Sequence, residues 1–405
     1  MDLKSGYPFW AVRNGLLHAF PRLESDASCD VAIVGGGITG AILARQLSQD
    51  GLDVMVLEQR DVAWGSTAAS TALLQYEIDT PMSDLARRYG EDNAALAYRA
   101  CAGAIPLLDS WCGELRDGAF QRTPSLYYAS SRWHVERLRQ EHAIRRRHGL
   151  AVSLLSREEV RERYGFAAPA ALLSELGAQM DPYRFTYRLL ARLERQGVRV
   201  HDRTRLADFE VRGGKLGLRT AHGVRIRAHF LVIAAGYAAQ GFIKQRVARN
   251  RSSYAMVTDP LDSAALGAWR RLVAWETARP YLYLRTTSDH RVLIGGEDDD
   301  VDIPARRDLR VQAKARKLLR RAARVLPGVQ LEPGFSWGGT FAETADGLPF
   351  FGAHRQHGPR VLFAMAYGGN GITYSAIGAG LLSALIARRR HPLARLFSFE
   401  RLKRR

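Results

Sequence analysis

Residues 30–58 read DVAIVGGGITGAILARQLSQDGLDVMVLE, and this stretch decides the fold. The apolar run 30–34 predicts a β-strand, and the glycine-rich residues 35–40 predict a turn. Residues 41–49 carry apolar side chains at helical spacing, and residues 52–57 form a second apolar run. The order strand, turn, helix, strand indicates a βαβ unit at the start of an α/β fold.

Three glycines in the turn follow the pattern Gly-x-Gly-x-x-Gly, at Gly35, Gly37 and Gly40, with Ile38 between the last two. The first glycine permits the tight turn, the second lets backbone N–H groups approach a pyrophosphate, and the third lets helix and strand pack closely. Glu58 ends the second strand, where a carboxylate accepts hydrogen bonds from a ribose 2′-hydroxyl and repels a 2′-phosphate. The alternative is a glycine-rich turn of an ordinary α/β protein. The complete set of strand, helix, second strand and terminal acid favours a dinucleotide site.

The bulk composition is that of a folded chain with more than one domain. Of its 405 residues, 46% are hydrophobic and 25% are charged, so the chain can bury a sizeable core. The formal net charge of +18 raises the question of nucleic acid or an anionic membrane as a partner. The positive residues are dispersed, with short clusters at Arg145–Arg147, Arg388–Arg390 and Arg401–Arg405, and aromatic residues are not interleaved with them. We therefore expect no nucleic-acid partner and leave a peripheral membrane contact open.

Cysteine usage and hydropathy bear on the compartment. Cys29, Cys101 and Cys112 form no Cys-x-x-Cys pair and no metal-ligand spacing, so we expect neither disulfides nor a metal site. Residues 1–20 lack the apolar core of an export signal. The apolar stretch 371–387 is marginal in length for a membrane span and is interrupted by Thr, Tyr, Ser and Gly, which favours a buried helix. The expected protein is cytoplasmic and has no transmembrane segment.

Helical and strand-like segments alternate in blocks along the rest of the chain. Residues 81–149 are mainly helical around the strand-like 121–129, and residues 245–300 are mostly strand-like. We expect an α/β protein with a Rossmann-like nucleotide domain and an interleaved substrate domain built on a mixed antiparallel sheet plus helices. The expected boundaries are 28–80, 180–240 and 340–405 for the first domain, 81–179 and 241–339 for the second, and 1–27 for an N-terminal extension.

Five later stretches carry a resemblance to a known family. They are GSTAASTA (65–72), HFLVIAAG (229–236), YLYLRTTSDHRVLIGG (281–296), ADGLPFFG (345–352) and AYGGNGITYSAIGAGLL (366–382). Together with the βαβ unit, and in this order, they resemble the D-amino-acid oxidase, glycine oxidase and sarcosine oxidase superfamily of FAD enzymes. Within it, the chain looks most like bacterial γ-glutamylputrescine-oxidase-like and D-amino-acid-dehydrogenase-like members.

The resemblance implies FAD as the cofactor and assigns residues to it. The turn glycines cradle the pyrophosphate, and the segment that opens the apolar helix lies beneath the flavin. There the N-terminal dipole of the helix stabilises negative charge that develops on reduction. The residues assigned to FAD are Gly35, Gly37, Ile38, Gly40, Glu58, Gln59, Arg60, Gly65, Ser66, Thr67, Ser70, Arg205, Leu206, Ala235, Gly236, Gly369, Asn370, Gly371, Ile372 and Thr373.

The chain departs from the family pattern at several places. Relatives that tether FAD use a Cys or a His that is missing here, which implies non-covalent FAD. Relatives that act on α-amino acids place an Arg where Gly338, Gly339 or Gly369 stands, which weighs against a small amino acid anchored by its carboxylate. Sarcosine-oxidising relatives carry lysines where Thr373 and Leu293 stand, so the electron acceptor is left open between O2 and a membrane quinone.

Five residues are candidates for the substrate site. Glu276 can attract a cationic amine and can equally be a carboxylate on an edge strand. Arg285 can bind an acidic group of the substrate, although a strand arginine is more often solvated or ion-paired. Tyr283 lies on an aromatic strand face and Trp337 precedes two glycines, and core packing is the alternative for both. Asn370 lies in the turn before the apolar helix.

The implied activity is FAD-dependent oxidation of a C–N bond in an amine or in a secondary or D-amino acid. In the family a hydride passes to flavin N5, and water hydrolyses the imine product. Two other functions stay open: a flavin enzyme that acts on modified tRNA, which the net charge of +18 would suit, and a non-catalytic FAD-bearing subunit of a complex.

Overall fold

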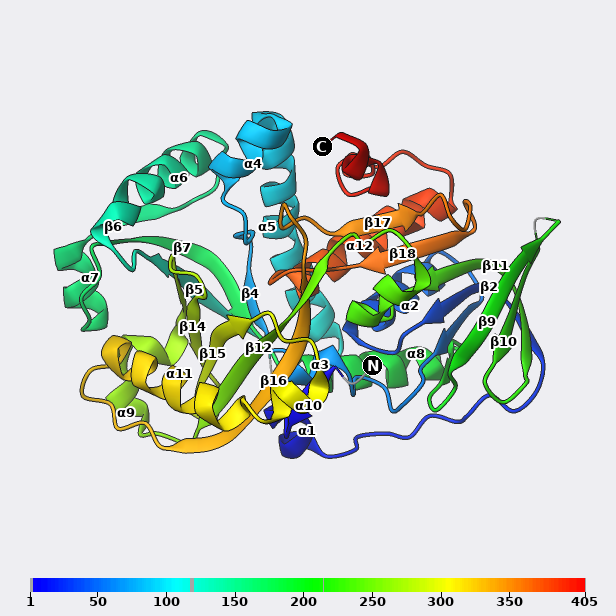
Figure 1. Cartoon of the computed structure of the whole chain (residues 1–405), viewed down its shortest axis with the longest axis horizontal. Helices are drawn as coiled ribbons and strands as arrows, with labels where there is room; N and C mark the ends of the chain where they lie inside the picture. The colour runs from blue at the N-terminus through cyan, green and yellow to red at the C-terminus, as the bar shows by residue number, and fades with distance from the viewer. Residues whose placement is uncertain (1–2, 117–119, 214, 405) are drawn as a thin grey trace.

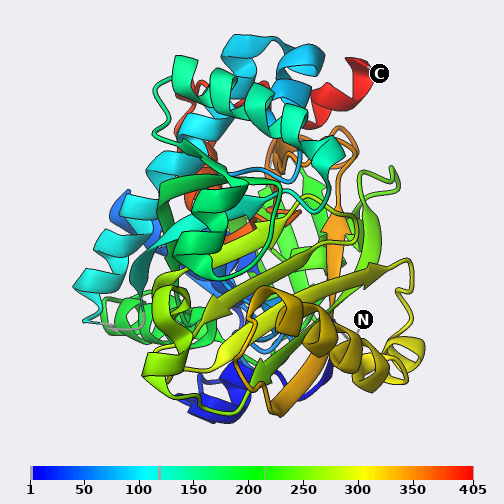
Figure 2. The ribbon, with the colours of Figure 1, turned by 90° about the vertical axis from the view of Figure 1, so that its left-hand side faces the viewer.

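The chain folds around two β-sheets. The computed structural model describes residues 3–116, 120–213 and 215–404. Figure 1 shows the eight-stranded sheet in the right-hand lobe, the ten-stranded sheet in the left-hand lobe, and the helices α5 and α12 between them. Figure 2, seen from the side of the ten-stranded sheet, shows α11 lying in front of its strands.

The eight-stranded sheet is built on the βαβ unit. Its strands are β2 (Ala27–Val34), β3 (Val54–Leu57), β8 (Arg199–His201), β9 (Leu206–Arg212), β10 (Lys215–Thr220), β11 (Arg225–Ile233), β17 (Phe350–Ala353) and β18 (Val361–Met365). In the order β18-β11-β2-β3-β8 all neighbours are parallel, and β17 adds an antiparallel edge. β9 and β10 form an antiparallel meander with β11. This is the doubly covered parallel sheet of a Rossmann-like domain.

Both faces of the sheet are buried at its centre, which explains why residues 31–34 of β2 and all residues of β3 and β18 are apolar. On β2, Val31 and Ile33 pack toward the helices, whereas Ala32 and Val34 pack with β10, β11 and the segment after β11.

The α-helices are α1 (Phe9–Asn14), α2 (Ile38–Gln49), α3 (Ser66–Ala69), α4 (Met82–Tyr89), α5 (Glu91–Glu114), α6 (Val135–Arg147), α7 (Arg157–Tyr164), α8 (Pro182–Arg195), α9 (Ser263–Leu266), α10 (Pro304–Asp308), α11 (Val311–Val325) and α12 (Gly371–Ile386). Short 3₁₀ helices are η1 (Arg132–His134), η2 (Gly236–Phe242), η3 (Gly267–Arg271) and η4 (Phe399–Arg404).

The ten-stranded sheet is mostly antiparallel and draws on distant parts of the chain. Its strands are β1 (Lys4–Gly6), β4 (Leu73–Gln75), β5 (Gln121–Tyr128), β6 (Ser153–Ser156), β7 (Ala170–Gln179), β12 (Arg249–Thr258), β13 (Val273–Glu276), β14 (Leu282–Thr286), β15 (Val292–Asp299) and β16 (Pro333–Glu343). The order is β1-β16-β12-β15-β14-β13-β5-β7-β4, and β6 also pairs with β7. The parallel pair β13–β5 joins strands from the two chain segments that were expected to form the substrate domain.

The predicted fold class is confirmed, because the chain combines a Rossmann-like parallel sheet with a second, mixed antiparallel sheet. Sheet membership differs from the expected division at three places. β1 lies in the expected N-terminal extension but pairs with β16, and β4 lies within the expected 28–80 but pairs with β7. β16 itself runs across the expected boundary at 340. β1 and β4 are short edge strands set by tertiary pairing, which a local pattern does not reveal.

The apolar stretch near the C-terminus is the helix α12, which packs on α2 and α5 in the core. In the described part of the chain, no helix is both long enough and apolar enough to cross a membrane.

The packing of α12 on β17 gives a test of the core. A Cβ added at Gly378 would lie 2.1 Å from the Phe351 ring, whereas Gly380 on the same helix has nothing within 4 Å of that position. We expect Gly378→Ala to lower the free energy of unfolding by about 1–3 kcal/mol, because overpacking forces the ring to move. Gly380→Ala should raise it by roughly 0.5–1 kcal/mol, since alanine favours a helix. Thermal and denaturant unfolding measure both, and equal effects of the two variants would contradict this packing.

Candidate functional site

A cavity of ≈ 350 Å³ begins at the carboxyl ends of β2, β3 and β11 and continues to the ten-stranded sheet. Its glycine end is lined by Val34, Gly35, Gly37, Ile38, Leu57, Glu58, Gln59, Arg60, Ser66, Thr67, Thr204, Arg205, Leu206, Ala234 and Ala235. Its aromatic end is lined by Asp79, Tyr237, Ser253, Tyr254, Trp275, Tyr281, Tyr283, Asp298 and Trp337, with residues 369–373 at the start of α12. Ligands of open α/β sheets bind outside the carboxyl ends of the strands, where this cavity starts.

The turn at the glycine end excludes side chains by close backbone contact. A Cβ at Gly40 would lie 1.8 Å from the carbonyl oxygen of Gly35. Only glycine at position 40 therefore lets α2 lie this close to the end of β2. Gly35 has φ +119°, and a Cβ there would lie 2.3 Å from the carbonyl oxygen of Ala234. Helix α2 begins directly after Gly37, so its N-terminus faces the cavity and suits a phosphate.

Two side chains complete the glycine end. The Glu58 carboxylate accepts hydrogen bonds from the backbone N–H of Gly36 and of Arg60, each at 2.9 Å, and burial raises its pKa. Ser66 Oγ lines the cavity and is buried without a hydrogen-bond partner among the described residues. A buried hydroxyl without a partner calls for a ligand that accepts or donates a hydrogen bond. The cradle, the acid at the end of β3 and this orphaned hydroxyl fit a dinucleotide such as FAD.

The loop after α3 is held from behind through three successive carbonyl groups. Trp337 Nε1 donates to the Ala69 oxygen at 2.9 Å, and Trp10 Nε1 donates to the Ser70 oxygen at 2.8 Å. Arg285 Nε donates to the Thr71 oxygen at 2.6 Å. Because all three carbonyls accept a side-chain hydrogen bond, this loop presents a fixed backbone to the cavity.

Arg285 serves this loop and does not line the cavity. Its side chain is 3% exposed, and it also donates to Gln179 Oε1 at 3.3 Å and to the Met180 oxygen at 2.9 Å. Burial lowers its pKa. Tyr283 on the same strand and Tyr281 just before it do reach the cavity, but Arg285 lies two residues further along β14 and contacts the loop. A substrate-binding role for Arg285 in this cavity does not match its position.

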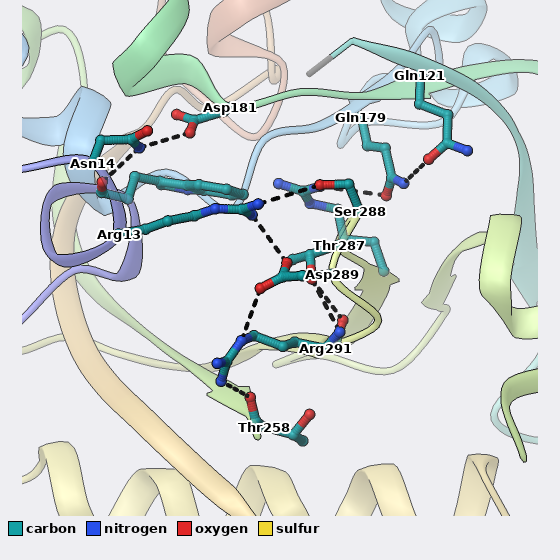
Figure 3. A network of polar contacts seen from close by, with 12 residues as sticks. Arg13, Asn14, Gln121, Gln179, Asp181, Thr258, Thr287, Ser288, Asp289 and Arg291 are labelled. Atoms are coloured by element: carbon teal, nitrogen blue, oxygen red, sulfur yellow. Dashed lines mark hydrogen bonds and ion pairs between the residues drawn. The ribbon is translucent and has the colours of Figure 1, made fainter. Parts of the chain in front are cut away.

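Figure 3 shows the polar network on the outer side of this loop. Arg13 donates to Asp289 at 3.0 Å and to Ser288, and Gln179 donates to Gln121 at 2.7 Å. Asn14 donates to Asp181 at 2.8 Å, which ties α1 to the start of α8. The network joins the N-terminal segment to the ten-stranded sheet and to the start of α8.

Asn370 fixes the start of α12. Its Nδ2 group donates to the carbonyl oxygens of Gln75 at 3.0 Å and Glu77 at 2.9 Å. The backbone N–H of Gly369 donates to Asp79 Oδ2 at 2.7 Å, and Tyr281 Oη donates to Asp79 Oδ1 at 2.9 Å. The side chain of Asn370 is therefore a structural tie, while the helix N-terminus beside it opens on the cavity.

The aromatic end contains two carboxylates that the sequence did not indicate. Asp79 is held by Gly369 and Tyr281, as described above. Asp298 lines the cavity with Oδ1 buried and without a hydrogen-bond partner among the described residues, and burial raises its pKa to about 6. A bulge in β15, where Gly296 has φ +136° and Glu297 has φ 56°, turns Asp298 toward the cavity and Glu297 toward Lys317 on α11.

Glu276 lies on the opposite face of its strand from the cavity. Its neighbour Trp275 lines the cavity, whereas the Glu276 carboxylate accepts from Ser130 Oγ at 2.8 Å, from the Leu282 N–H at 2.9 Å and from Arg321. Alternation along β13 explains the difference. The structure gives Glu276 a buried ion pair in place of the expected contact with substrate.

The remaining candidates line the cavity, apart from Gly40, whose role is the close approach of α2. They are Gly35, Gly37, Ile38, Glu58, Gln59, Arg60, Gly65, Ser66, Thr67, Ser70, Arg205, Leu206, Ala235, Gly236, Tyr283, Trp337, Gly369, Asn370, Gly371, Ile372 and Thr373. Asp79 and Asp298 were missed because they lie in a loop and in the acidic run 297–300, and neither position shows a periodic signal.

Comparisons with known proteins agree with this geometry. A family model described as FAD dependent oxidoreductase matches residues 30–385. The chain is 25% identical over 94% of its length, and over 73% of the relative, to the putative Rieske 2Fe-2S iron-sulfur protein YhfW of Bacillus subtilis. It is 22% identical to the gamma-glutamylputrescine oxidoreductase of Escherichia coli, over 91% of this chain and 85% of that protein. The structure of glycine oxidase from Geobacillus kaustophilus superposes with a TM-score of 0.77 and 21% identity, covering 92% of this chain and 98% of the other.

The support of the loop after α3 can be tested at Trp337. Trp337→Phe keeps a ring and removes the donor to the Ala69 oxygen, and a buried acceptor left without its donor costs about 1–3 kcal/mol. We expect a lower unfolding midpoint and weaker retention of the bound cofactor during gel filtration. Trp133→Phe is the matched control, because Trp133 is 85% exposed. Indistinguishable behaviour of the two variants would show that this hydrogen bond does not hold the loop.

Proposed function

The chain belongs to the family of FAD-dependent oxidoreductases, and from that premise we propose that it oxidises the C–N bond of an amine or amino acid. The observation that carries the proposal is the continuity of one cavity from the glycine turn to the start of α12 and the carboxylates Asp79 and Asp298. Its two ends thus offer a place for a dinucleotide and a place for a nitrogen cation.

The glycine end would hold FAD without a covalent bond. Gly35, Gly37 and Ile38 would face the pyrophosphate at the N-terminus of α2, and Glu58 would face the ribose. Among the described residues that line the cavity there is no Cys and no His to form a tether. The N-terminus of α12 would lie at the flavin, where a positive helix end stabilises negative charge.

The reaction balances as amine plus FAD plus water giving a carbonyl compound, a released amine and reduced FAD. Bound FAD supplies the two-electron acceptor that takes a hydride from the carbon next to nitrogen. The substrate nitrogen must give up a proton before that carbon is oxidised, because a protonated amine has no lone pair to form the C=N bond. The unpartnered Oδ1 of Asp298 is a buried acceptor that can hold this proton. Water then adds to the imine and releases the carbonyl product.

We propose O2 or a quinone as the electron acceptor. The match covers 73% of the relative named for a Rieske 2Fe-2S protein, so that relative extends beyond the matched stretch. An iron–sulfur protein is therefore a third electron acceptor to test, beside O2 and a quinone. Cys29, Cys101 and Cys112 are buried, and Cys29 and Cys101 form no disulfide in the part of the chain that the structure describes, which supports a reducing cytoplasm as the compartment.

The other two functions have direct tests. Retention of tRNA on a filter at low salt, lost on raising the salt, would support an enzyme that acts on modified tRNA. Protein that holds FAD but is reduced only in a complex with a second subunit would support a non-catalytic FAD-bearing subunit.

The proposal predicts a yellow purified protein whose flavin absorbance bleaches when an amine is added without air. The bleached spectrum should return on admitting air, with peroxide formed, or only on adding a quinone analogue or an iron–sulfur protein. Gly40→Ala is the control for the site, because its Cβ would meet the Gly35 oxygen, and we expect this variant to be purified without FAD. A wild-type protein that is colourless and does not take up added FAD would refute the proposed function.

A further inference from the structure

The substrate class follows from the charges at the aromatic end, given the proposed C–N oxidation. Arg60 and Arg205 are the cations among the described residues that line the cavity, and both lie at the glycine end. At the aromatic end the ionisable acids are Asp79 and Asp298, and no lysine, arginine or histidine of the described residues lines it. The end that would receive the substrate is therefore acidic.

Both carboxylates lie in the cavity wall, and they differ in the hydrogen bonds that their oxygens already accept. Asp79 already accepts from the Gly369 N–H and from Tyr281 Oη. Asp298 keeps Oδ1 buried and without a partner, and the nearby charge of Asp79 adds to burial in raising the pKa of Asp298. Two like charges in a poorly solvated cavity repel each other, and a bound cation relieves that repulsion.

The side chains around the carboxylates are aromatic. Tyr237, Trp275, Tyr281 and Tyr283 line the same end, and the Trp275 and Tyr281 rings meet edge to face at 6.5 Å. Aromatic faces attract ammonium and alkylammonium groups, most strongly where water is excluded. This wall is an observation independent of the carboxylates, and it points to the same ligand charge.

Arg279 is a cation that acts on Asp298 from outside the cavity lining. Arg279 stacks on the Tyr281 ring at 4.2 Å, donates to the Asp79 carbonyl at 2.9 Å and pairs with Glu343 at 3.9 Å. Its side chain is 51% exposed and does not line the cavity. Its positive charge lowers the pKa of Asp298, the negative charge of Glu343 raises it, and Ser253 donates a hydrogen bond that lowers it.

We propose that the substrate is a cationic amine without a carboxylate on the reacting carbon, and that Asp298 is the residue that selects it. The ammonium group is bound by Asp298 Oδ1, by the Asp79 carboxylate and by the faces of the surrounding aromatic rings. An α-amino acid is disfavoured because it would place its own carboxylate in an acidic wall, which in the described part of the chain is lined by no guanidinium to pair with it.

The test compares each α-amino acid with the amine that lacks its carboxylate. The pairs are alanine with ethylamine, proline with pyrrolidine, phenylalanine with phenethylamine, and ornithine with putrescine, both enantiomers of each acid being used. Anaerobic flavin bleaching by the holoenzyme measures the reductive rate for each. We expect at least one amine to reduce the flavin with a second-order rate constant at least tenfold higher than that of its amino acid. Faster reduction by the amino acids overturns this inference and leaves the proposed function intact, whereas no reduction by either series overturns the proposed function itself.

The role of Asp298 has its own variant and control. Asp298→Asn keeps the shape and removes the charge, and we expect KM for the best amine to rise tenfold or more. Asp300→Asn makes the same change two residues along the chain, where the side chain is exposed and pairs with Arg249, and it should leave KM unchanged. An unchanged KM in Asp298→Asn overturns the assignment.

Inhibition by a permanently charged cation tests the same proposal on the wild-type protein, so the test does not depend on a variant that folds. Tetramethylammonium does not titrate, so any pH dependence of its competitive inhibition constant reports protein groups alone. Asp298 has a pKa raised to about 6, so it is charged above that pH and neutral below it. We expect the inhibition constant to rise several-fold as the pH falls through about 6. A flat profile in the wild-type enzyme overturns the proposal.

Discussion

The structure depends on how closely the first helix approaches the first strand of the nucleotide-binding sheet. At Gly40 the backbone of α2 lies so near Gly35 that a single added carbon would sit 1.8 Å from a carbonyl oxygen. That contact aims the N-terminus of α2 across the ends of β2 and β3, and it leaves Glu58 to accept from the turn itself. Without this contact, neither the positive N-terminus of α2 nor the Glu58 carboxylate would be aligned with the glycine end of the cavity.

The same principle of fixing a backbone from outside governs the loop that follows. Trp10, Trp337 and Arg285 come from the N-terminal segment, from β16 and from β14, and each uses a donor on one of three successive carbonyls. Two of these elements belong to the ten-stranded sheet, so this sheet positions a loop that lines the glycine end. The ten-stranded sheet and α1 are therefore tied by hydrogen bonds to the short segment that lines the cavity.

Sequence reasoning placed the residues of the glycine end and, at the aromatic end, Tyr283, Trp337 and residues 369–373. It misplaced Glu276 and missed Asp298, for physical reasons. Gly35, Gly40 and Glu58 act through backbone geometry over a short stretch, so their spacing alone predicts their place. Glu276 and Asp298 act through the face they occupy, and a one-residue change of register moves a strand side chain from one face to the other. The bulge at Gly296 and Glu297 depends on pairing between β15 and β12, which no local pattern reveals.

Arg285 illustrates the same limit for a charged residue. A strand arginine can bind an acidic group of the substrate or, more often, is solvated or ion-paired. Here its guanidinium donates to two backbone carbonyls and to a side-chain amide. With Arg285 turned away, Arg60 and Arg205 line the glycine end beside Glu58, whereas the aromatic end has Asp79 and Asp298 and no cation among the described residues. The outer surface carries most of a net charge of +18, but salt screens exposed charges beyond about 8–10 Å. The sign of the ligand accepted at each end is therefore set by the few groups that line it, and a basic protein can hold an acidic pocket for a cation.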